Sequence, residues 1–184
     1  MSDTAPRLIL MCGISGSGKT TLARDASTHL PDGHSGYLYL CPDDFYKVFH
    51  GDERIHTNEF EVWMSLWQAL HTAEMNGRNV ILDTNAPTIV DRVQFLNWFP
   101  GFETTVVCVL ASPEICRYRN AHRSRVVPPE EMDRMIRRFQ LPFPEEDERY
   151  RGVLYYRSAP DKKFIQTDAS YAREWQKLYQ RKEV

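Results

Sequence analysis

The stretch GISGSGKT, residues 13–20, constrains the fold more than any other feature of the sequence. It matches the pattern G-x-x-x-x-G-K-[ST] at Gly13, Gly18, Lys19 and Thr20, between an apolar run and a helical pattern. In this pattern backbone N–H groups curl around phosphates, the lysine reaches the β- and γ-phosphate oxygens, and the hydroxyl ligates Mg²⁺. The stretch therefore predicts a site for a nucleoside triphosphate, expected to be ATP with Mg²⁺. The expected binding residues also include the other positions of the loop and the residue after it, Ser15, Gly16, Ser17 and Thr21.

Apolar runs rich in β-branched residues alternate with helical patterns along the chain. The runs are RLILMC, YLYLC, NVILD, TTVVCVL and GVLYY, and each is typical of a fully buried strand. Strands that alternate with helices predict βαβ units with right-handed crossovers. We therefore expect an α/β fold, with a parallel sheet of about five strands flanked by helices.

Capping signals locate the expected helices. Residues 58–77 begin with an Asn58/Glu61 capping box and end at Gly77, and Thr88 with Asp91 repeats the box before the next helix. The segment SPEICRYRNAHR has Ser112 as its N-cap, with proline at the first helical position. A final amphipathic helix is expected over residues 170–183, with its aromatic side chains facing the core.

Length and composition favour one soluble domain over residues 1–184. The chain is 42% apolar and 26% charged, and no apolar run approaches the ~18 residues of a membrane span. The first residues lack a signal-peptide pattern, and the four cysteines form no Cys-x-x-Cys pair. We therefore expect no membrane association, reduced thiols, and a cytoplasmic location, or the host-cell cytoplasm for a viral protein.

A phosphate loop alone does not specify a reaction. The strings Asn-Lys-x-Asp and Asp-x-x-Gly that switch GTPases need are both absent. A small phosphotransferase needs a base for the acceptor hydroxyl and positive charge for the transferred phosphoryl group. Asp43 and Asp44 follow the second strand, where a carboxylate can deprotonate a hydroxyl or merely cap a helix. Asp83 follows the third strand, where it can hold the magnesium shell or the acceptor, or form a turn.

Arginines are concentrated between Arg117 and Arg138. This segment has seven arginines and one histidine against three acidic residues, and a proline-broken joint divides it. If it is helical to about Arg123, then Arg119 and Arg123 lie four residues apart on one face and can both reach the phosphates. We expect an arginine-rich helical lid over residues 117–140, with Arg134 on a solvated face. The alternative is that the whole stretch is a solvated helix face.

Taken together, the order of these motifs resembles the kinase domain of bacteriophage-type polynucleotide 5′-hydroxyl kinases, over residues 7 to about 142. The shared order is the phosphate loop, DD after the second strand, DTN after the third, then RN followed by arginine and VP. The resemblance implies that Asp43 is the general base, that Asp83 is the strand-end aspartate, and that Arg123 contacts the transferred phosphate. The resemblance also implies a P-loop kinase fold, in which Lys19 and Thr20 correspond to the loop pair. The expected substrate-binding residues are Asp44, Tyr46 and Asn85, and Arg119 is expected to help bind the nucleotide.

Two departures from that family concern the acceptor. The family often has arginine three residues after the base, where this sequence has Tyr46, and no Asp-x-Asp-Gly-Thr phosphatase signature occurs. We expect the 5′-hydroxyl of DNA or RNA, or a nucleotide-like molecule, as acceptor, with Phe45 and Tyr46 stacking on it or packing in the core. A kinase of a hydroxymethylated base, a nucleoside or a small metabolite, and a non-catalytic ATP-binding switch, remain as alternatives.

Overall fold

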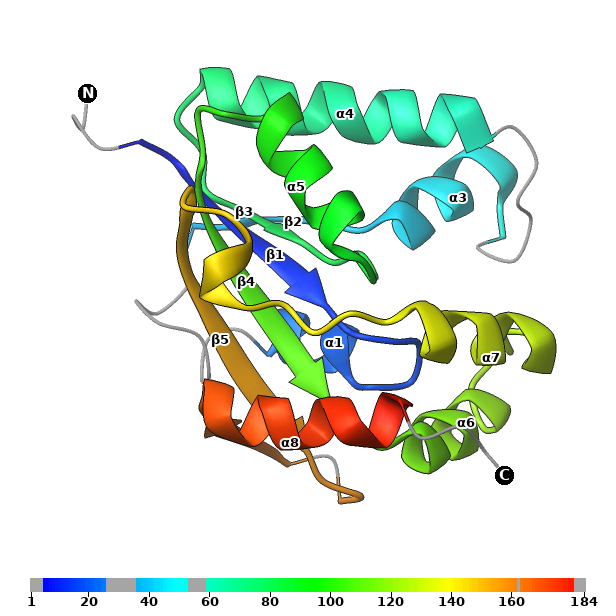
Figure 1. The fold of residues 1–184 in the computed structure, drawn as a ribbon. Coiled ribbons are helices and arrows are strands. Elements are labelled where there is room, and N and C mark those ends of the chain that lie inside the picture. The colour runs from blue at the N-terminus through cyan, green and yellow to red at the C-terminus, as the bar shows by residue number, and fades with distance from the viewer. Residues whose placement is uncertain (1–4, 26–35, 53–58, 162, 181–184) are drawn as a thin grey trace.

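A six-stranded sheet forms the centre of the molecule (Figure 1). The computed structural model describes residues 5–25, 36–52, 59–161 and 163–180. The sheet order is β2-β3-β1-β4-β5-β6, and all neighbours pair in parallel except β5 and β6. The strands are β1 (Arg7–Cys12), β2 (Leu38–Leu40), β3 (Val80–Leu82), β4 (Glu103–Leu110), β5 (Tyr150–Ser158) and β6 (Phe164–Thr167).

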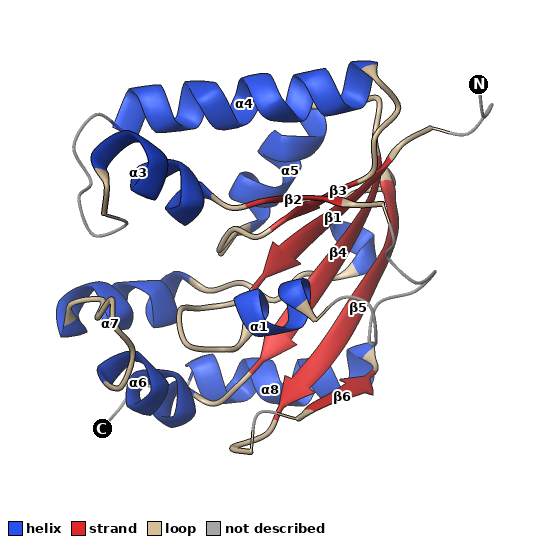
Figure 2. Ribbon diagram, turned by 180° about the vertical axis from the view of Figure 1, so that it is seen from behind, coloured by secondary structure: helices blue, strands red, loops and turns tan. Residues whose placement is uncertain are grey.

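Helices flank both faces of this sheet, as the view from behind makes clear (Figure 2). They are α1 (Lys19–Arg24), α3 (Pro42–His50), α4 (Glu59–Met75), α5 (Ile89–Trp98), α6 (Pro113–Ala121), α7 (Pro129–Arg138) and α8 (Ala169–Gln180), with a 3₁₀ turn η1 at Pro144–Glu146. Alternate residues of β1 enter two separate cores because successive strand side chains point to opposite faces. Leu8 and Leu10 pack in the core that includes residues of α4 and α5, whereas Ile9 and Met11 pack with Leu22 of α1.

The expected α/β fold and several helix caps are confirmed. Thr88 and Asp91 form the reciprocal capping box of α5, and the Ser112 hydroxyl accepts a hydrogen bond at the start of α6. Gly77 follows α4 with a φ of 64°, a left-handed conformation that favours glycine. Asn58 and residues 181–183 of the expected last helix lie outside the described residues.

The structure adds a strand to the expected sheet and corrects the expected end of one helix. The sheet has a sixth strand, β6, because a four-residue antiparallel strand with no fully buried residue carries almost no sequence signal. Helix α6 ends at Ala121, so Arg123 is not helical. The proline-broken joint expected at residues 123–131 does separate two helices, α6 and α7.

Candidate active site

A cleft of about 920 Å³ runs along the carboxyl edge of the parallel strands. The segments that follow β1, β2, β3, β4 and β5 all contribute to its wall, which is the edge where parallel α/β sheets bind ligands. Most predicted site residues line this one cleft, although more than a hundred positions separate the first from the last. They are Ser15, Gly16, Gly18, Lys19, Thr20, Thr21, Asp43, Tyr46, Asp83, Asn85, Arg119 and Arg123.

The phosphate loop has the backbone that its glycines predict. Gly13, Gly16 and Gly18 have φ angles of 143°, 81° and 105°, which L side chains rarely adopt. A Cβ atom on Gly16 would lie 2.5 Å from the carbonyl oxygen of Cys116, so this position also has no space for a side chain. Within the described part of the chain the backbone N–H groups of Gly16, Gly18 and Lys19 donate no hydrogen bond. These donors are therefore available to an anion.

Lys19 and Asp83 place opposite charges in the depth of the cleft. The Lys19 Nζ atom donates to the Ile14 carbonyl at 3.0 Å, and burial lowers the pKa of this lysine while the charge of Asp83 opposes that change. Asp83 is 4% exposed and accepts a hydrogen bond of 2.7 Å from the Tyr39 hydroxyl. Burial and the nearby Asp83 carboxylate raise the pKa of Tyr39, so its hydroxyl remains protonated and can donate.

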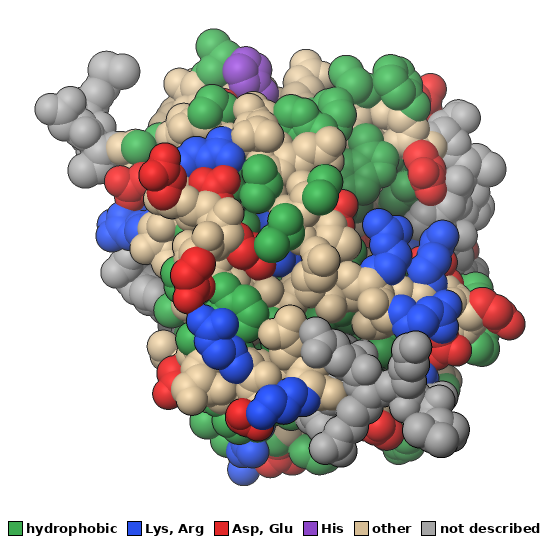
Figure 3. Space-filling view, in the orientation of Figure 1, with side chains coloured by type: hydrophobic (Ala, Val, Ile, Leu, Met, Phe, Trp, Pro, Cys, Tyr) green, Lys and Arg blue, Asp and Glu red, His purple; other side chains and the backbone are tan. Residues whose placement is uncertain are grey.

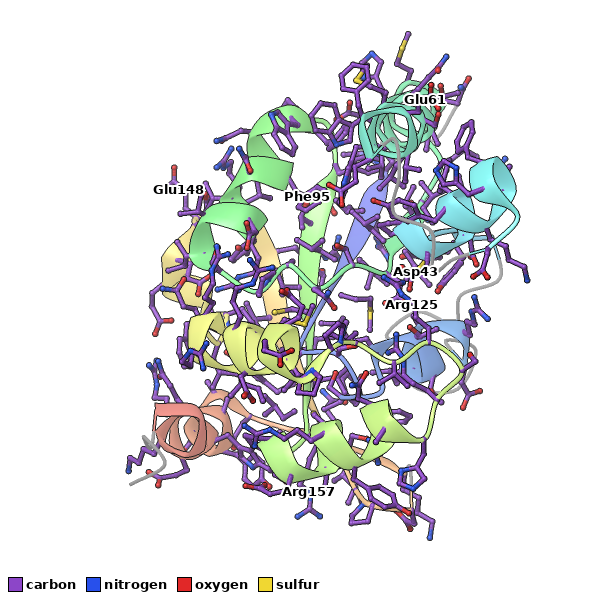
Figure 4. All side chains as sticks on the ribbon, turned by 90° about the vertical axis from the view of Figure 1, so that its right-hand side faces the viewer. Asp43, Glu61, Phe95, Arg125, Glu148 and Arg157 are labelled. Atoms are coloured by element: carbon purple, nitrogen blue, oxygen red, sulfur yellow. The ribbon has the colours of Figure 1, made fainter. Side chains whose placement is uncertain are left out.

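The two adjacent aspartates of α3 lie in different surroundings. Asp43 lines the cleft and forms an ion pair with Arg125, and Figure 4 shows the two side chains between α3 and the segment that joins α6 to α7. Asp44 does not line the cleft; its half-exposed side chain pairs with Arg24 of α1 at 3.4 Å. The N-cap of α3 is Cys41, and the two aspartate carboxylates accept hydrogen bonds from arginines outside the helix. Only Asp43 is therefore positioned to meet an acceptor in the cleft.

Two arginines reach the phosphate loop from the opposite wall. Arg119 donates to the Gly16 and Ser17 carbonyls at 3.4 and 3.3 Å and to the Ser158 hydroxyl at 2.9 Å. Arg123 donates to the Ser15 hydroxyl at 3.0 Å. Both guanidinium groups thus lie against the loop that is expected to hold phosphates.

The loop between α6 and α7 is closed by one buried amide. The Asn120 side chain donates to the Val127 carbonyl at 2.8 Å and accepts from the Val127 N–H at 3.0 Å. Asn120 is 5% exposed, so both bonds are shielded from water. These contacts fix the ends of the loop that carries Arg123 and Arg125 into the cleft.

The other predicted residues serve the walls of the site. The Asn85 carbonyl accepts from the Gly13 N–H at 3.2 Å, and this contact joins the turn after β3 to the phosphate loop. Gly13 and Ser17 lie beneath the cleft surface, and Ser17 is fully buried. Tyr46 lines the cleft but is only 4% exposed, and Phe45 packs against the core. Neither ring leaves a broad face for stacking.

Sequence reasoning missed several residues of the cleft wall. Ser158 ends β5 and Phe164 begins β6, and an atom of Phe164 lies 3.1 Å from the position of a Cβ on Gly18. The rule that ligands meet the carboxyl ends of strands could have found Ser158. Trp63 of α4 packs against the core and lines the cleft as well.

The donor set of the cleft fits a magnesium ion held mainly by phosphates. The described residues contain no group of three or more His, Cys, Asp or Glu side chains that could hold a metal ion. The Thr20 hydroxyl and the Asp83 carboxylate both line the cleft, however, and Mg²⁺ commonly binds one or two protein oxygens together with substrate phosphates and water.

In the part of the chain that the structure describes, no helix has the length and apolar character needed to cross a membrane. The four cysteines form no disulfide.

Comparisons with known proteins agree with this geometry. A family model described as AAA domain matches residues 8–142, and no curated protein matches the chain. Among solved structures, the chain is similar to a putative kinase from Chloroflexus aurantiacus j-10-fl, with 21% identity and a TM-score of 0.63 over 97% of this chain and 100% of that one.

Two further solved structures share the fold. One is a chain of the Pnkp1/Rnl/Hen1 RNA repair complex, with 17% identity and a TM-score of 0.63 over 92% of this chain and 51% of that one. The present chain thus spans about half the length of that relative. The other is a gluconokinase from Sinorhizobium meliloti 1021, with 17% identity and a TM-score of 0.52 over 95% and 96% of the two chains. At these identities the likeness concerns the fold, which is that of P-loop kinases.

Proposed function

This chain belongs to the AAA domain family, and from that membership and its cleft we propose that it is an ATP- and Mg²⁺-dependent kinase that phosphorylates the 5′-hydroxyl end of DNA or RNA. The observation that carries the proposal is the convergence of Lys19, Asp43, Asp83 and two arginines on one cleft. A phosphotransferase needs these groups together, whereas a protein that only binds phosphates through such a loop does not.

Each side chain has a role that its surroundings allow. Lys19 would hold the β- and γ-phosphate oxygens, and Arg119 and Arg123 would offset the negative charge that spreads over the transferred phosphoryl group. Asp43 would orient the acceptor hydroxyl and accept its proton. When bound through Thr20 and Asp83, Mg²⁺ would neutralise phosphate charge.

The segment of residues 117–140 would act as a lid in this reaction. Arg123 and Arg125 already span from its loop to the phosphate loop and to Asp43. An acceptor that enters the cleft would displace Arg125 from Asp43, and the loop would then exclude water from the reacting groups.

We regard residues 1–184 as a single domain that works in the cytoplasm, where the four free thiols would stay reduced.

Support for a nucleic-acid acceptor comes from the order of the motifs and from the fold shared with a chain of an RNA repair complex. The shared fold of the gluconokinase makes a small hydroxylated metabolite the alternative to test. The test is a screen with γ-labelled ATP against a 5′-hydroxyl oligonucleotide, a duplex with hydroxymethylated bases, nucleosides and gluconate. Label on the oligonucleotide end supports the proposal, and label only on another acceptor refutes it. Lys19→Ala, checked for folding by circular dichroism, is expected to abolish transfer, since it removes the cation that faces the phosphates.

The assignment of the base makes a separate prediction. Asp43→Asn should lower kcat by about 10²–10⁴-fold because an amide keeps the shape of the side chain but cannot accept a proton. Asp44→Asn is the matched control: it makes the same chemical change outside the cleft and should leave kcat within about twofold of wild type. Binding of ATP, measured by calorimetry, should survive in both variants. A larger loss in Asp44→Asn than in Asp43→Asn would show that the base is assigned to the wrong aspartate.

A further inference from the structure

A second pocket of about 490 Å³ opens beside the cleft, between α4, α5 and α7. The two spaces share wall residues, among them Trp63 and Asn85, so the pocket continues the cleft beyond the turn that follows β3. A molecule that presents a hydroxyl to Asp43 can therefore extend into this pocket. The roles described so far make no use of it.

The wall of the pocket is unusually aromatic for this chain. Three of its four tryptophans line the pocket: Trp63, Trp67 and Trp98. The ring centroids of Trp67 and Trp98 lie 4.6 Å apart, and Phe95 meets Trp98 edge-on with 5.9 Å between the ring centroids. Trp98 is 41% exposed, so part of its ring remains open to a ligand. The buried Nε1–H group of Trp67 has no hydrogen-bond partner among the described residues. Planar apolar groups are the ligands that such a wall stacks against.

Basic side chains of α7 border the aromatic wall. Figure 3 shows Lys and Arg side chains gathered over α7, next to hydrophobic side chains over α4 and α5. Arg134 lies on the solvated face that the sequence predicted, with its side chain 60% exposed, and it also lines the pocket and pairs with Glu131. Arg138 also lines the pocket, and within the described residues it makes no hydrogen bond or ion pair. The rim of the pocket thus offers an uncompensated cation to an anion.

The polar groups of the pocket favour an anion over a sugar. Carboxylates are the usual acceptors for sugar hydroxyls, and each of the two carboxylates of this wall already has a partner on one of its oxygens. Asp91 accepts hydrogen bonds of 3.0 and 2.7 Å from the N–H and hydroxyl of Thr88, and Glu131 is paired with Arg134. Aromatic rings beside an available arginine match a nucleobase joined to a phosphodiester.

We propose that the pocket between α4, α5 and α7 binds the acceptor strand of a single-stranded nucleic acid, with a base against Trp67 and Trp98 and a backbone phosphate at Arg138. The inference rests on the proposed function, because it assumes that the acceptor hydroxyl lies at Asp43. It deepens that function by adding a second contact that a small metabolite or a lone nucleoside would lack.

Binding can be measured without catalysis, because the tryptophans report on the pocket directly. A short single-stranded oligonucleotide with a 5′-hydroxyl end, titrated in the absence of ATP, is expected to quench tryptophan fluorescence. Arg138→Gln should weaken its binding by roughly tenfold and reduce the slope of log K against log salt by about 0.7, since one phosphate contact is lost. Trp98→Leu should weaken binding by roughly 5- to 100-fold, the loss expected for one stacked base.

Arg137→Gln is the matched control, because Arg137 is exposed on the same helix and does not line the pocket. It should bind the oligonucleotide with less than a twofold change, apart from a small general effect of charge. Wild-type affinity and salt slope in Arg138→Gln would overturn the inference, and so would quenching by gluconate without quenching by the oligonucleotide.

The two proposals fail in different ways. Binding at the pocket without transfer of phosphate would refute the kinase reaction and leave the pocket assignment standing. Transfer to the oligonucleotide with the same KM in Arg138→Gln and wild type would leave the reaction standing and refute the pocket. In Arg138→Gln and Trp98→Leu the KM for ATP should stay unchanged, because the changes lie in the acceptor pocket and not in the phosphate loop.

Discussion

Glu146→Gln tests whether one buried ion pair fixes the position of the turn after β3, which lies between the cleft and the aromatic pocket. Arg92 is fully buried, and its guanidinium donates to the Glu146 carboxylate at 2.7 and 3.0 Å in a two-pronged contact. The remaining nitrogen donates to the carbonyls of Ala86 at 3.1 Å and Gln140 at 2.9 Å. Ala86 has a φ of 37°, a strained value for a residue with a side chain.

The expected loss follows from this burial. Removal of one partner from a buried pair costs about 3–5 kcal/mol because the other charge stays in the core without compensation. For a chain of this length, 1 kcal/mol changes Tm by about 2–4 °C, so Glu146→Gln should lower Tm by about 6–20 °C. Differential scanning calorimetry gives the value directly.

The neighbouring residue supplies the control. Glu145→Gln makes the same chemical change in the pair with Arg173, whose side chains are 52% and 68% exposed, and should lower Tm by less than about 3 °C. The double change Arg92→Met with Glu146→Leu should recover part of the loss, because no charge remains buried, but it leaves the Ala86 and Gln140 carbonyls without their donor. Equal Tm values for Glu146→Gln and Glu145→Gln would refute the reasoning.

Two further predictions concern the phosphate loop. Arg123→Lys should lower kcat at least about 100-fold, because a point charge cannot make the planar contact of a guanidinium with a phosphoryl group. The control Arg137→Ala should leave kcat near wild type. Equal kcat values for the two variants in steady-state assays would contradict this. Gly16→Ala should destabilise the protein in urea titrations by more than Gly51→Ala. Both glycines have positive φ, but among the described residues only a Cβ on Gly16 meets another atom within 4 Å. Equal losses would mean that strain, and not the contact, limits position 16.

Local patterns predicted the fold well because each depends on residues close in sequence. The capping box of Thr88 and Asp91 spans four residues, and each of the five expected strands is an uninterrupted apolar run. The pair of Arg92 and Glu146 joins residues 54 positions apart. An arginine within an amphipathic helix carries no sign that it will be buried, so the sequence could not predict this contact.

The candidate site likewise combines features that the sequence predicts with features that it does not. Strand ends predicted that Asp43, Asp83 and the phosphate loop would meet, since the order of parallel strands brings their carboxyl ends to one edge. Strand ends do not distinguish the two adjacent aspartates, however; the family resemblance assigned the base to Asp43, and in the structure the helix turns the two side chains in different directions. Successive side chains of a helix point about 100° apart, so Asp43 meets the cleft while Asp44 meets Arg24.

The arginines of the α6–α7 segment contact the phosphate loop for a different reason from the one that the sequence suggests. Helical spacing predicted that Arg119 and Arg123 would reach the phosphate loop together, yet α6 ends at Ala121 and only Arg119 belongs to it. Arg123 reaches the loop because the two hydrogen bonds between Asn120 and Val127 turn the chain back toward the cleft. These bonds are shielded from water, so they compete with no solvent and fix the loop more firmly than exposed bonds would. The position of Arg123 therefore depends on a buried amide three residues earlier and not on the helix that precedes it.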